Sequence, residues 1–216
     1  MLEGVKRGAK KDAVRTSFGE PLDGIVKGNT RYLSNSDENN KNFDIYELRG
    51  GYVTFFYDVF KNNSLTSVNI IDCDVEEGFL RLYADKSEEL KVSFEMQNFY
   101  VTNATRVNEG LPPLITHDGL NKTALSHAKD LAEKEYFSHK NKNGETVLDR
   151  ALNYGVKLKS IGENLAMGAQ NSVYMHELLM NSEGHRKNIL ADFTHVGVGV
   201  AFSDDNAPYL VQNFLK

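Results

Sequence analysis

The first half of the chain carries the residue pattern of short strands. Four runs rich in β-branched and aromatic residues read as strands, at Tyr52–Tyr57, Leu65–Ile71, Phe79–Tyr83 and Leu90–Phe94. Asn62-Asn63 supplies a turn between the first two runs, so we expect a β-hairpin there. A short helix is expected over Ala9–Phe18, ahead of Pro21, and residues 34–40 read as a polar loop. Residues 1–97 thus predict a small domain of one helix and antiparallel strands, with a binding or spacer role by default.

The second half changes to helical spacing. From Leu120, the residues Ala124, Ala128 and Leu131 fall on one face of a helix. Two more helices are expected, one over Thr146–Asn153 and one that begins with Ser172 as its cap. The chain ends in two strands joined by a turn, at Val196–Phe202 and Tyr209–Phe214. Residues 98–216 therefore predict an α+β domain in which helices cover both faces of a small antiparallel sheet, an α-β-α sandwich.

Composition narrows the function classes. The 216 residues are 40% hydrophobic and 25% charged, as in ordinary globular proteins. Acidic and basic residues are interspersed, with a net charge of −5, which argues against a nucleic-acid partner. No apolar run approaches the roughly 20 residues of a membrane span, and Met1–Arg15 lack the apolar core of a signal peptide. Cys73 is the only cysteine, so no disulfide forms within the chain, and we expect it to be a small buried residue at a strand end.

Several segments of the second half carry a family resemblance. They occur in the order Asn108–Leu114, Tyr136–His139, Gly162–Ala166, Met180–Leu190, Phe193–Gly199 and Gln212–Phe214. Together they resemble the CAP superfamily (cysteine-rich secretory, antigen 5, pathogenesis-related 1), in the form found in bacteria. The strands before Tyr100 resemble the N-terminal domain that accompanies some bacterial members. The resemblance implies an exported or cell-surface protein, whose signal would lie upstream of Met1.

The resemblance also implies a cleft lined by two histidines and two acidic residues. His139 matches the first histidine, Glu163 the first acid and His185 the second histidine. Ser182 stands nearest the place of the second acid, and the adjacent Glu183 is its possible substitute. The hypothesis of a functional site requires these side chains, which are distant in sequence, to lie around one pocket.

Two classes of function follow from this cleft. In the first, the protein is a binding module for a lipid, glycan, peptide or protein of the cell envelope. In the second, it is a metal-dependent hydrolase or peptidase, with His139 and His185 as ligands of a weakly held, open Zn²⁺ and Glu163 as the base. Alternatively, these residues form no functional site. Both histidines then hydrogen-bond to Glu163 and only hold the surrounding loops in place.

Three other signals favour structural roles. His127 lies on the apolar face of its helix and is expected to be a core histidine. His176-Glu177 begins like a zinc-peptidase helix motif, but Met180 stands where the second histidine is required. Ser182 precedes a short helical stretch, so we expect it to be a helix cap rather than a nucleophile.

Overall fold

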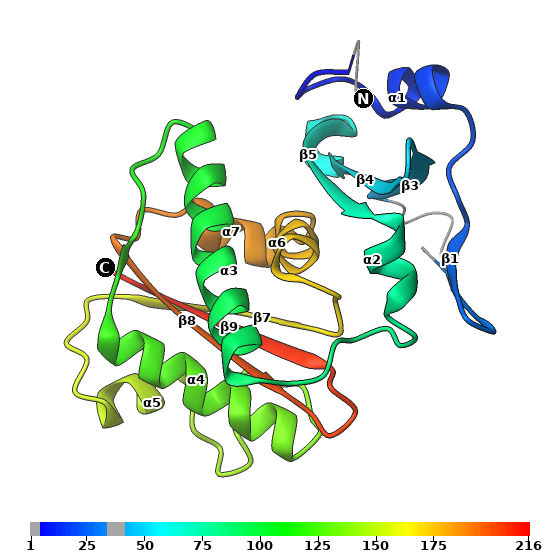
Figure 1. Ribbon diagram of the computed structural model, residues 1–216. Coiled ribbons are helices and arrows are strands. Elements are labelled where there is room, and N and C mark those ends of the chain that lie inside the picture. Colours follow the sequence, from blue (N-terminus) through cyan, green and yellow to red (C-terminus); the bar gives the residue numbers. More distant parts are fainter. Residues whose placement is uncertain (1–4, 34–41) are drawn as a thin grey trace. The chain divides into compact units, whose positions relative to one another are not determined.

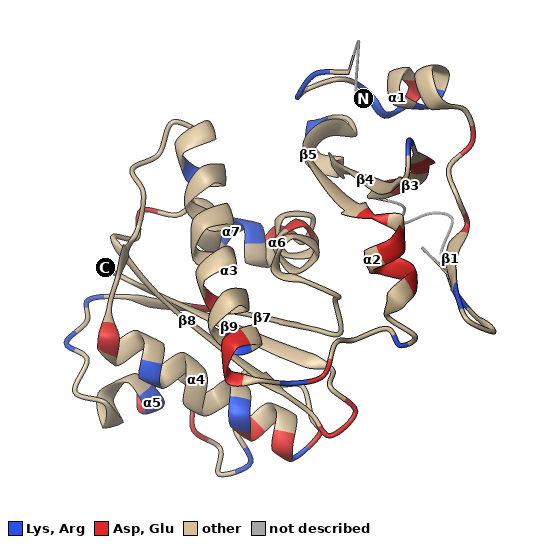
Figure 2. Ribbon diagram, in the orientation of Figure 1, with Lys and Arg blue, Asp and Glu red and all other residues tan. Residues whose placement is uncertain are grey.

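The computed structural model describes residues 5–33 and 42–216, and these divide into two compact units, Met1–Ala84 and Asp85–Lys216 (Figure 1). The expected domain boundary at 97/98 falls inside an unbroken helix, α3, which belongs wholly to the second unit. The loop expected at residues 34–40 lies outside the described residues. Charged residues of both signs are interspersed along both units (Figure 2).

The first unit contains two small antiparallel sheets. Its elements are α1 (Lys11–Phe18), β1 (Gly24–Lys27), β2 (Thr30–Leu33), β3 (Phe43–Leu48), β4 (Gly51–Asp58), the 3-10 helix η2 (Val59–Lys61), β5 (Ser64–Asp72) and α2 (Cys73–Gly78). Strand β1 pairs with β2, and β4 lies between β3 and β5. The expected hairpin is confirmed as β4 and β5, with Asn62 and Asn63 both at positive φ between them.

The core of the first unit lies between α1 and the three-stranded sheet. Val14 of α1 packs with Tyr46, Val53, Phe55 and Tyr57. Cys73 is half-buried and begins α2 directly after β5. Burial raises the pKa of its thiol, as do several neighbouring carboxylates, which disfavours the reactive thiolate.

The second unit is built around a four-stranded sheet. Its elements are α3 (Glu88–Asn108), β6 (Ile115–Thr116), α4 (Asp118–Glu133), α5 (Val147–Asn153), β7 (Ile161–Met167), α6 (Ser172–Met180), α7 (Glu183–Leu190), β8 (His195–Phe202) and β9 (Pro208–Leu215). The strand order is β6-β8-β9-β7, and all neighbours are antiparallel except β6 and β8.

Each face of this sheet has its own hydrophobic core. On one face, α3, α6 and α7 contribute Phe94, Met175 and Ile189, which cluster with Val198 and Phe214. On the other face, Ala128 and Leu131 of α4 cluster with Leu165 and Val211. Helices thus cover both sides of the sheet (Figure 1), and the predicted α-β-α sandwich is confirmed.

Two predicted strands are wrong. Residues Phe79–Tyr83 form no strand, and Leu90–Phe94 belong to α3. The buried positions of α3 are Phe94, Asn98, Thr102 and Arg106, so three of its four buried residues are polar. The pattern of apolar residues therefore did not indicate a helix here. Ser87 caps the helix by accepting a hydrogen bond from Leu90 N.

The third predicted helix begins as expected but with a different cap. Asn171, not Ser172, accepts the hydrogen bonds of Val173 N and Tyr174 N. The Ser172 hydroxyl instead donates to the carbonyl of Phe94 at 2.6 Å and so joins α6 to α3.

Helix α4 lies directly on β8 because two glycines leave room for its backbone. A Cβ at Gly199 would lie 2.2 Å from Leu125 N and 2.4 Å from the carbonyl carbon of Ala124. A Cβ at Gly197 would lie 2.2 Å from the carbonyl carbon of Leu120. Since these are backbone atoms, no side-chain rotation could relieve the contact.

We therefore expect Gly199→Ala to lower the free energy of unfolding by about 3 kcal/mol, because α4 would have to move away from the sheet. Urea denaturation followed by circular dichroism measures the change. Gly184→Ala on α7 is the matched control, since a Cβ there would meet nothing within 4 Å. A Gly199→Ala protein as stable as the control would contradict the close contact.

Candidate functional site

A buried ion pair on the edge strand β7 organises the candidate site. Glu163 of β7 is 7% exposed, and Arg150 of α5 is 4% exposed. Arg150 Nη2 donates to Glu163 Oε2 at 2.6 Å. Arg150 Nη1 donates to the carbonyls of His139, at 3.2 Å, and Glu145, at 2.8 Å. One guanidinium therefore fixes both the carboxylate and the backbone of the loop that carries His139.

The structure brings His139 and Glu163 together. His139 Nδ1 lies 3.0 Å from Glu163 Oε1, while the His139 side chain is 59% exposed. The amide of Asn213, oriented to satisfy its neighbours, donates to Glu163 Oε2 at 3.0 Å. Glu163 thus accepts hydrogen bonds at both oxygens and is positioned to orient the His139 ring.

His185 lies on the short helix α7, near enough to His139 for a charge there to affect it. It is half-buried, and its pKa is lowered by that burial and, to a smaller extent, by the charge of nearby His139. A positive charge on His139 would therefore oppose protonation of His185.

A buried amide network ties α7 to β7. Asn188 Nδ2 donates to the carbonyl of Glu163, at 3.1 Å, and to Asn164 Oδ1, at 2.9 Å. Asn164 Nδ2 in turn donates to the carbonyl of His185 and to Gln212 Oε1, both at 3.1 Å. Because Asn164 and Gln212 are fully buried, these contacts fix the register between His185 and Glu163.

The two candidates for the fourth position lie at the start of α7. Ser182 occupies the N-cap position of α7, as expected, but its side chain makes no capping hydrogen bond. Glu183 is the first residue of the helix and is exposed. Neither residue enters the hydrogen bonds described above for Glu163.

The donor set does not fit a three-ligand zinc centre. The described residues contain no group of three His, Cys, Asp or Glu side chains placed to hold a metal ion. Catalytic zinc usually has three protein ligands and one open position. With both Glu163 oxygens engaged by Arg150, Asn213 and His139, only His139 and His185 are left as ligands.

The histidines assigned to structural roles lie in the interior. His127 is fully buried, and its Nε2 lies 3.0 Å from the carbonyl of Ser138, as expected of a core histidine. His176 is 2% exposed, with Nε2 2.7 Å from Thr105 Oγ1. Desolvation lowers the pKa of His176 to about 4, so the ring is neutral at pH 7.

Sequence reasoning missed Arg150, Asn188 and Asn213. Asn188 and Asn213 lie inside segments that carried the resemblance, but nothing in those segments indicates that the two amides are directed at Glu163. Arg150 had no comparable signal, because a basic residue in a short helix is usually exposed.

Comparison of the sequence with known protein families agrees with this architecture. Residues 99–214 match the cysteine-rich secretory protein family (CAP), and residues 1–81 match the CAP-associated N-terminal family. The chain therefore belongs to the CAP family.

Two relatives from Bacillus subtilis (strain 168) are similar in sequence. The uncharacterized protein YkwD is 39% identical over 108 residues, which are 50% of this chain and 42% of that protein. The uncharacterized membrane protein YlbC is 30% identical over 205 residues, which are 88% of this chain and 58% of that protein. The chain thus spans about half the length of the curated relatives it matches.

Two solved bacterial structures share the fold over the whole chain, and a third shares it over part of the chain. An extracellular SCP-domain protein from Bacillus anthracis has a TM-score of 0.84 at 24% identity and covers 100% of this chain and 74% of its own. A cysteine-rich secretory protein from Staphylococcus aureus has a TM-score of 0.74 at 19% identity, with coverages of 100% and 72%. An outer surface protein of Borrelia burgdorferi covers 61% of this chain and 96% of its own, with a TM-score of 0.54 at 23% identity.

We expect Arg150→Leu to lower the free energy of unfolding by about 3 kcal/mol, because it leaves the buried Glu163 carboxylate without its cation. Thermal or urea denaturation measures the loss. Lys157→Leu, at an exposed position just after α5, should change stability by no more than about 0.5 kcal/mol. Equal stability of the two variants would mean that the ion pair does not hold the site.

The titration of His185 gives a second test. In the wild type, we expect its pKa to lie below the ordinary histidine value, because burial and the charge of His139 both oppose protonation. His139→Gln removes one of these causes, so the pKa of His185 should rise toward its ordinary value. The imidazole proton shifts in NMR, followed from pH 4 to pH 9, report the change. A pKa unaltered by this substitution would show that the two rings do not interact.

Proposed function

We propose that the protein is an exported or cell-surface binding module, and that the surface around His139, Glu163 and His185 contacts its ligand. The observation that carries this proposal is that both oxygens of Glu163 are engaged in hydrogen bonds within the protein. Its two oxygens accept from His139, Arg150 and Asn213, an arrangement that positions an imidazole rather than one that activates a water. The extracellular and surface locations named for two structural neighbours support export.

The tautomer of His139 defines the group that it recognises. Since Nδ1 faces a carboxylate, the proton of the neutral ring lies on Nδ1, and Nε2 presents a lone pair. With the side chain 59% exposed, this lone pair can accept a hydrogen bond from a ligand. Glycan hydroxyls, peptide amides and lipid headgroups of the cell envelope all carry such donors.

The alternative is a metal-dependent hydrolase or peptidase with Zn²⁺ on His139 and His185. That reaction needs Glu163 as a free base, whereas Glu163 is held by an arginine, an amide and the imidazole itself. The residues present therefore support a binding role over a hydrolytic one. Zinc held by two imidazoles would be weak and would be lost as they are protonated.

Retention on envelope material tests the proposal. The wild type, His139→Ala and His185→Ala are incubated with purified bacterial cell-wall sacculi and, separately, with vesicles of extracted membrane lipid, and the bound fraction is measured after sedimentation. We expect the wild type to bind one of the two, and each substitution to weaken binding about fivefold, the effect of one lost hydrogen bond. His195→Ala, on β8, is the matched control.

Two outcomes would overturn the binding module. One is wild-type retention that neither His139→Ala nor His185→Ala reduces. The other is turnover of a peptide library that appears with added Zn²⁺ and disappears in His139→Ala, which would establish the hydrolase instead.

A further inference from the structure

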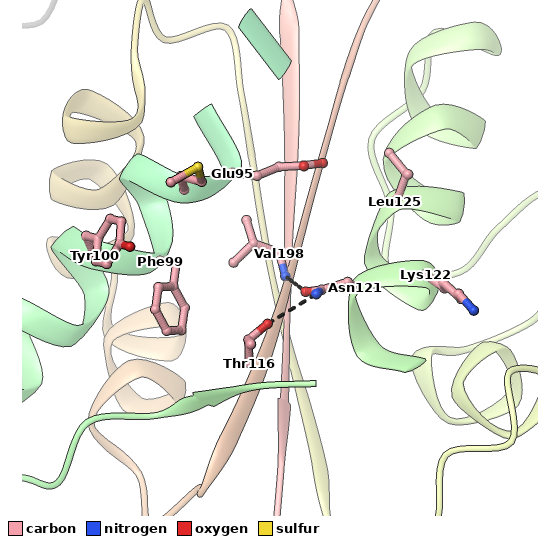
Figure 3. Close-up of a pocket in the computed structure, with 9 residues that line it drawn as sticks. Glu95, Phe99, Tyr100, Thr116, Asn121, Lys122, Leu125 and Val198 are labelled. Carbon is pink, nitrogen blue, oxygen red and sulfur yellow. Dashed lines mark hydrogen bonds between the residues drawn. The ribbon is translucent and has the colours of Figure 1, made fainter. Parts of the chain in front are cut away.

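Two hollows follow one another along the outer edge of β8. This edge of the sheet is opposite to the one formed by β7, the strand that carries Glu163. The first has a volume of about 400 Å³ and lies against Val198, and the second, of about 260 Å³, lies against Val200, Ala201 and Phe202. Helix α3 forms one wall of both hollows and α4 forms the other, as Figure 3 shows for the first hollow. We call this surface the β8 groove.

The floor of the groove is a strand edge with only a short partner. Strand β6 pairs in parallel with His195 and Val196, and the chain then leaves at His117 to begin α4. Beyond that point, Val198 N donates to Asn121 Oδ1 and Val200 N donates to Glu95 Oε1, both at 3.1 Å. Two side chains thus take the places that the carbonyls of a neighbouring strand would fill.

The same edge also offers acceptors. In an antiparallel pair, the N–H and C=O of one residue point to the same side, so the carbonyls of Val198 and Val200 face the groove as well. The edge therefore presents alternating donors and acceptors that match an extended polypeptide and do not match an acyl chain.

The two ends of the groove differ in chemistry. At the β6 end, the α3 wall carries Phe99 with the exposed Met96 and Tyr100, in a stretch without charged residues from 96 to 105 (Figures 2 and 3). Exposed apolar side chains beside a hollow are typical of an interaction site. At the other end, the lining includes three lysines and two glutamates, namely Lys86, Lys91, Lys129, Glu88 and Glu133.

We propose that the β8 groove binds an extended peptide that adds to β8 as a parallel strand, with its terminal carboxylate at the lysine end. The parallel direction continues the line that β6 begins. Main-chain hydrogen bonds to Val198 and Val200 would hold the peptide, and its side chains would alternate between the α3 and α4 walls. A segment of about six residues fills the distance, at roughly 3.3 Å per residue.

The side chains that now occupy the edge can leave without losing every partner. Glu95 Oε2 already lies 3.5 Å from Lys91 Nζ, and Asn121 Nδ2 donates to Thr116 Oγ1 at 3.1 Å. If a peptide carbonyl replaces Glu95 or Asn121 at β8, each of these side chains therefore still has a hydrogen-bonding or ionic partner. The N–H groups of Val198 and Val200 therefore have a hydrogen-bond acceptor both with and without a bound peptide.

A library of octapeptides with free carboxyl termini is the probe. Peptides selected on the wild-type protein are then methylated at one backbone nitrogen at a time, and their affinities are measured by fluorescence anisotropy. For strand addition, methylation of every second nitrogen should weaken binding at least tenfold, while the nitrogens between them tolerate it. Effects without this alternation, or no selected peptide at all, would overturn the proposal.

Two charge variants on one face of α4 test the direction of the peptide. Lys129→Glu lies at the lysine end, and Lys122→Glu, seven residues earlier and also exposed, lies at the β6 end. We expect Lys129→Glu to lower the affinity for the free-acid peptide three- to fivefold, which is the effect of losing an exposed ion pair. The affinity for the same peptide with a C-terminal amide should not fall. Lys122→Glu should leave the acid-to-amide ratio unchanged. The reverse pattern, or no change in the ratio with either variant, would refute the assigned direction.

The groove and the histidine surface lie at opposite edges of the sheet. His139→Ala should bind the selected peptide as tightly as the wild type does, since β7 and β8 are separated by β9. Loss of peptide binding in His139→Ala would place the peptide at the histidine surface and would overturn the groove.

Discussion

The close contact between α4 and β8 is the constraint on which the second unit depends. Gly197 and Gly199 let the helix backbone lie against the strand, and at that distance Asn121 reaches the edge N–H of Val198. The same placement sets one wall of the groove and packs Ala128 and Leu131 onto the sheet. A single added methyl group would act on all of these features, because the opposing atoms belong to the helix backbone.

On the other edge of the sheet, charge rather than packing sets the geometry. A buried carboxylate is costly unless it is paired and hydrogen-bonded, and Glu163 has three donors from three different elements of the fold. The arginine that neutralises it also holds the backbone of His139. The imidazole is therefore held at Nδ1, while its side chain is 59% exposed.

The two edges of the sheet are finished in different ways, and this gives the domain two surfaces of different character. Strand β7 is joined to α7 by the amides of Asn164 and Asn188, so its edge is closed by a rigid polar network. Strand β8 is closed only by the side chains of Asn121 and Glu95, which have other partners close by. Because Asn164 is fully buried, the contacts on the β7 side exchange partners less readily than the side-chain contacts to β8. The part of the chain that the structure describes contains no helix long and apolar enough to cross a bilayer.

The sequence by itself determined the layered fold, the terminal strands and the β4–β5 hairpin, because alternation and local motifs are properties of neighbouring residues. His139, Glu163 and His185 became candidates only through the family resemblance. Sequence reasoning failed for α3, whose buried positions include Asn98, Thr102 and Arg106, since buried polar residues are recognised only by the partners that tertiary contacts provide. It also could not find Arg150 or the amides of Asn188 and Asn213, which come from separate elements and meet only in the folded chain. Whether Glu163 is a base or a positioning group depends on what surrounds its two oxygens. Only the tertiary structure shows those surroundings, because hydrogen-bond partners more than ten residues apart give no periodic pattern in a sequence.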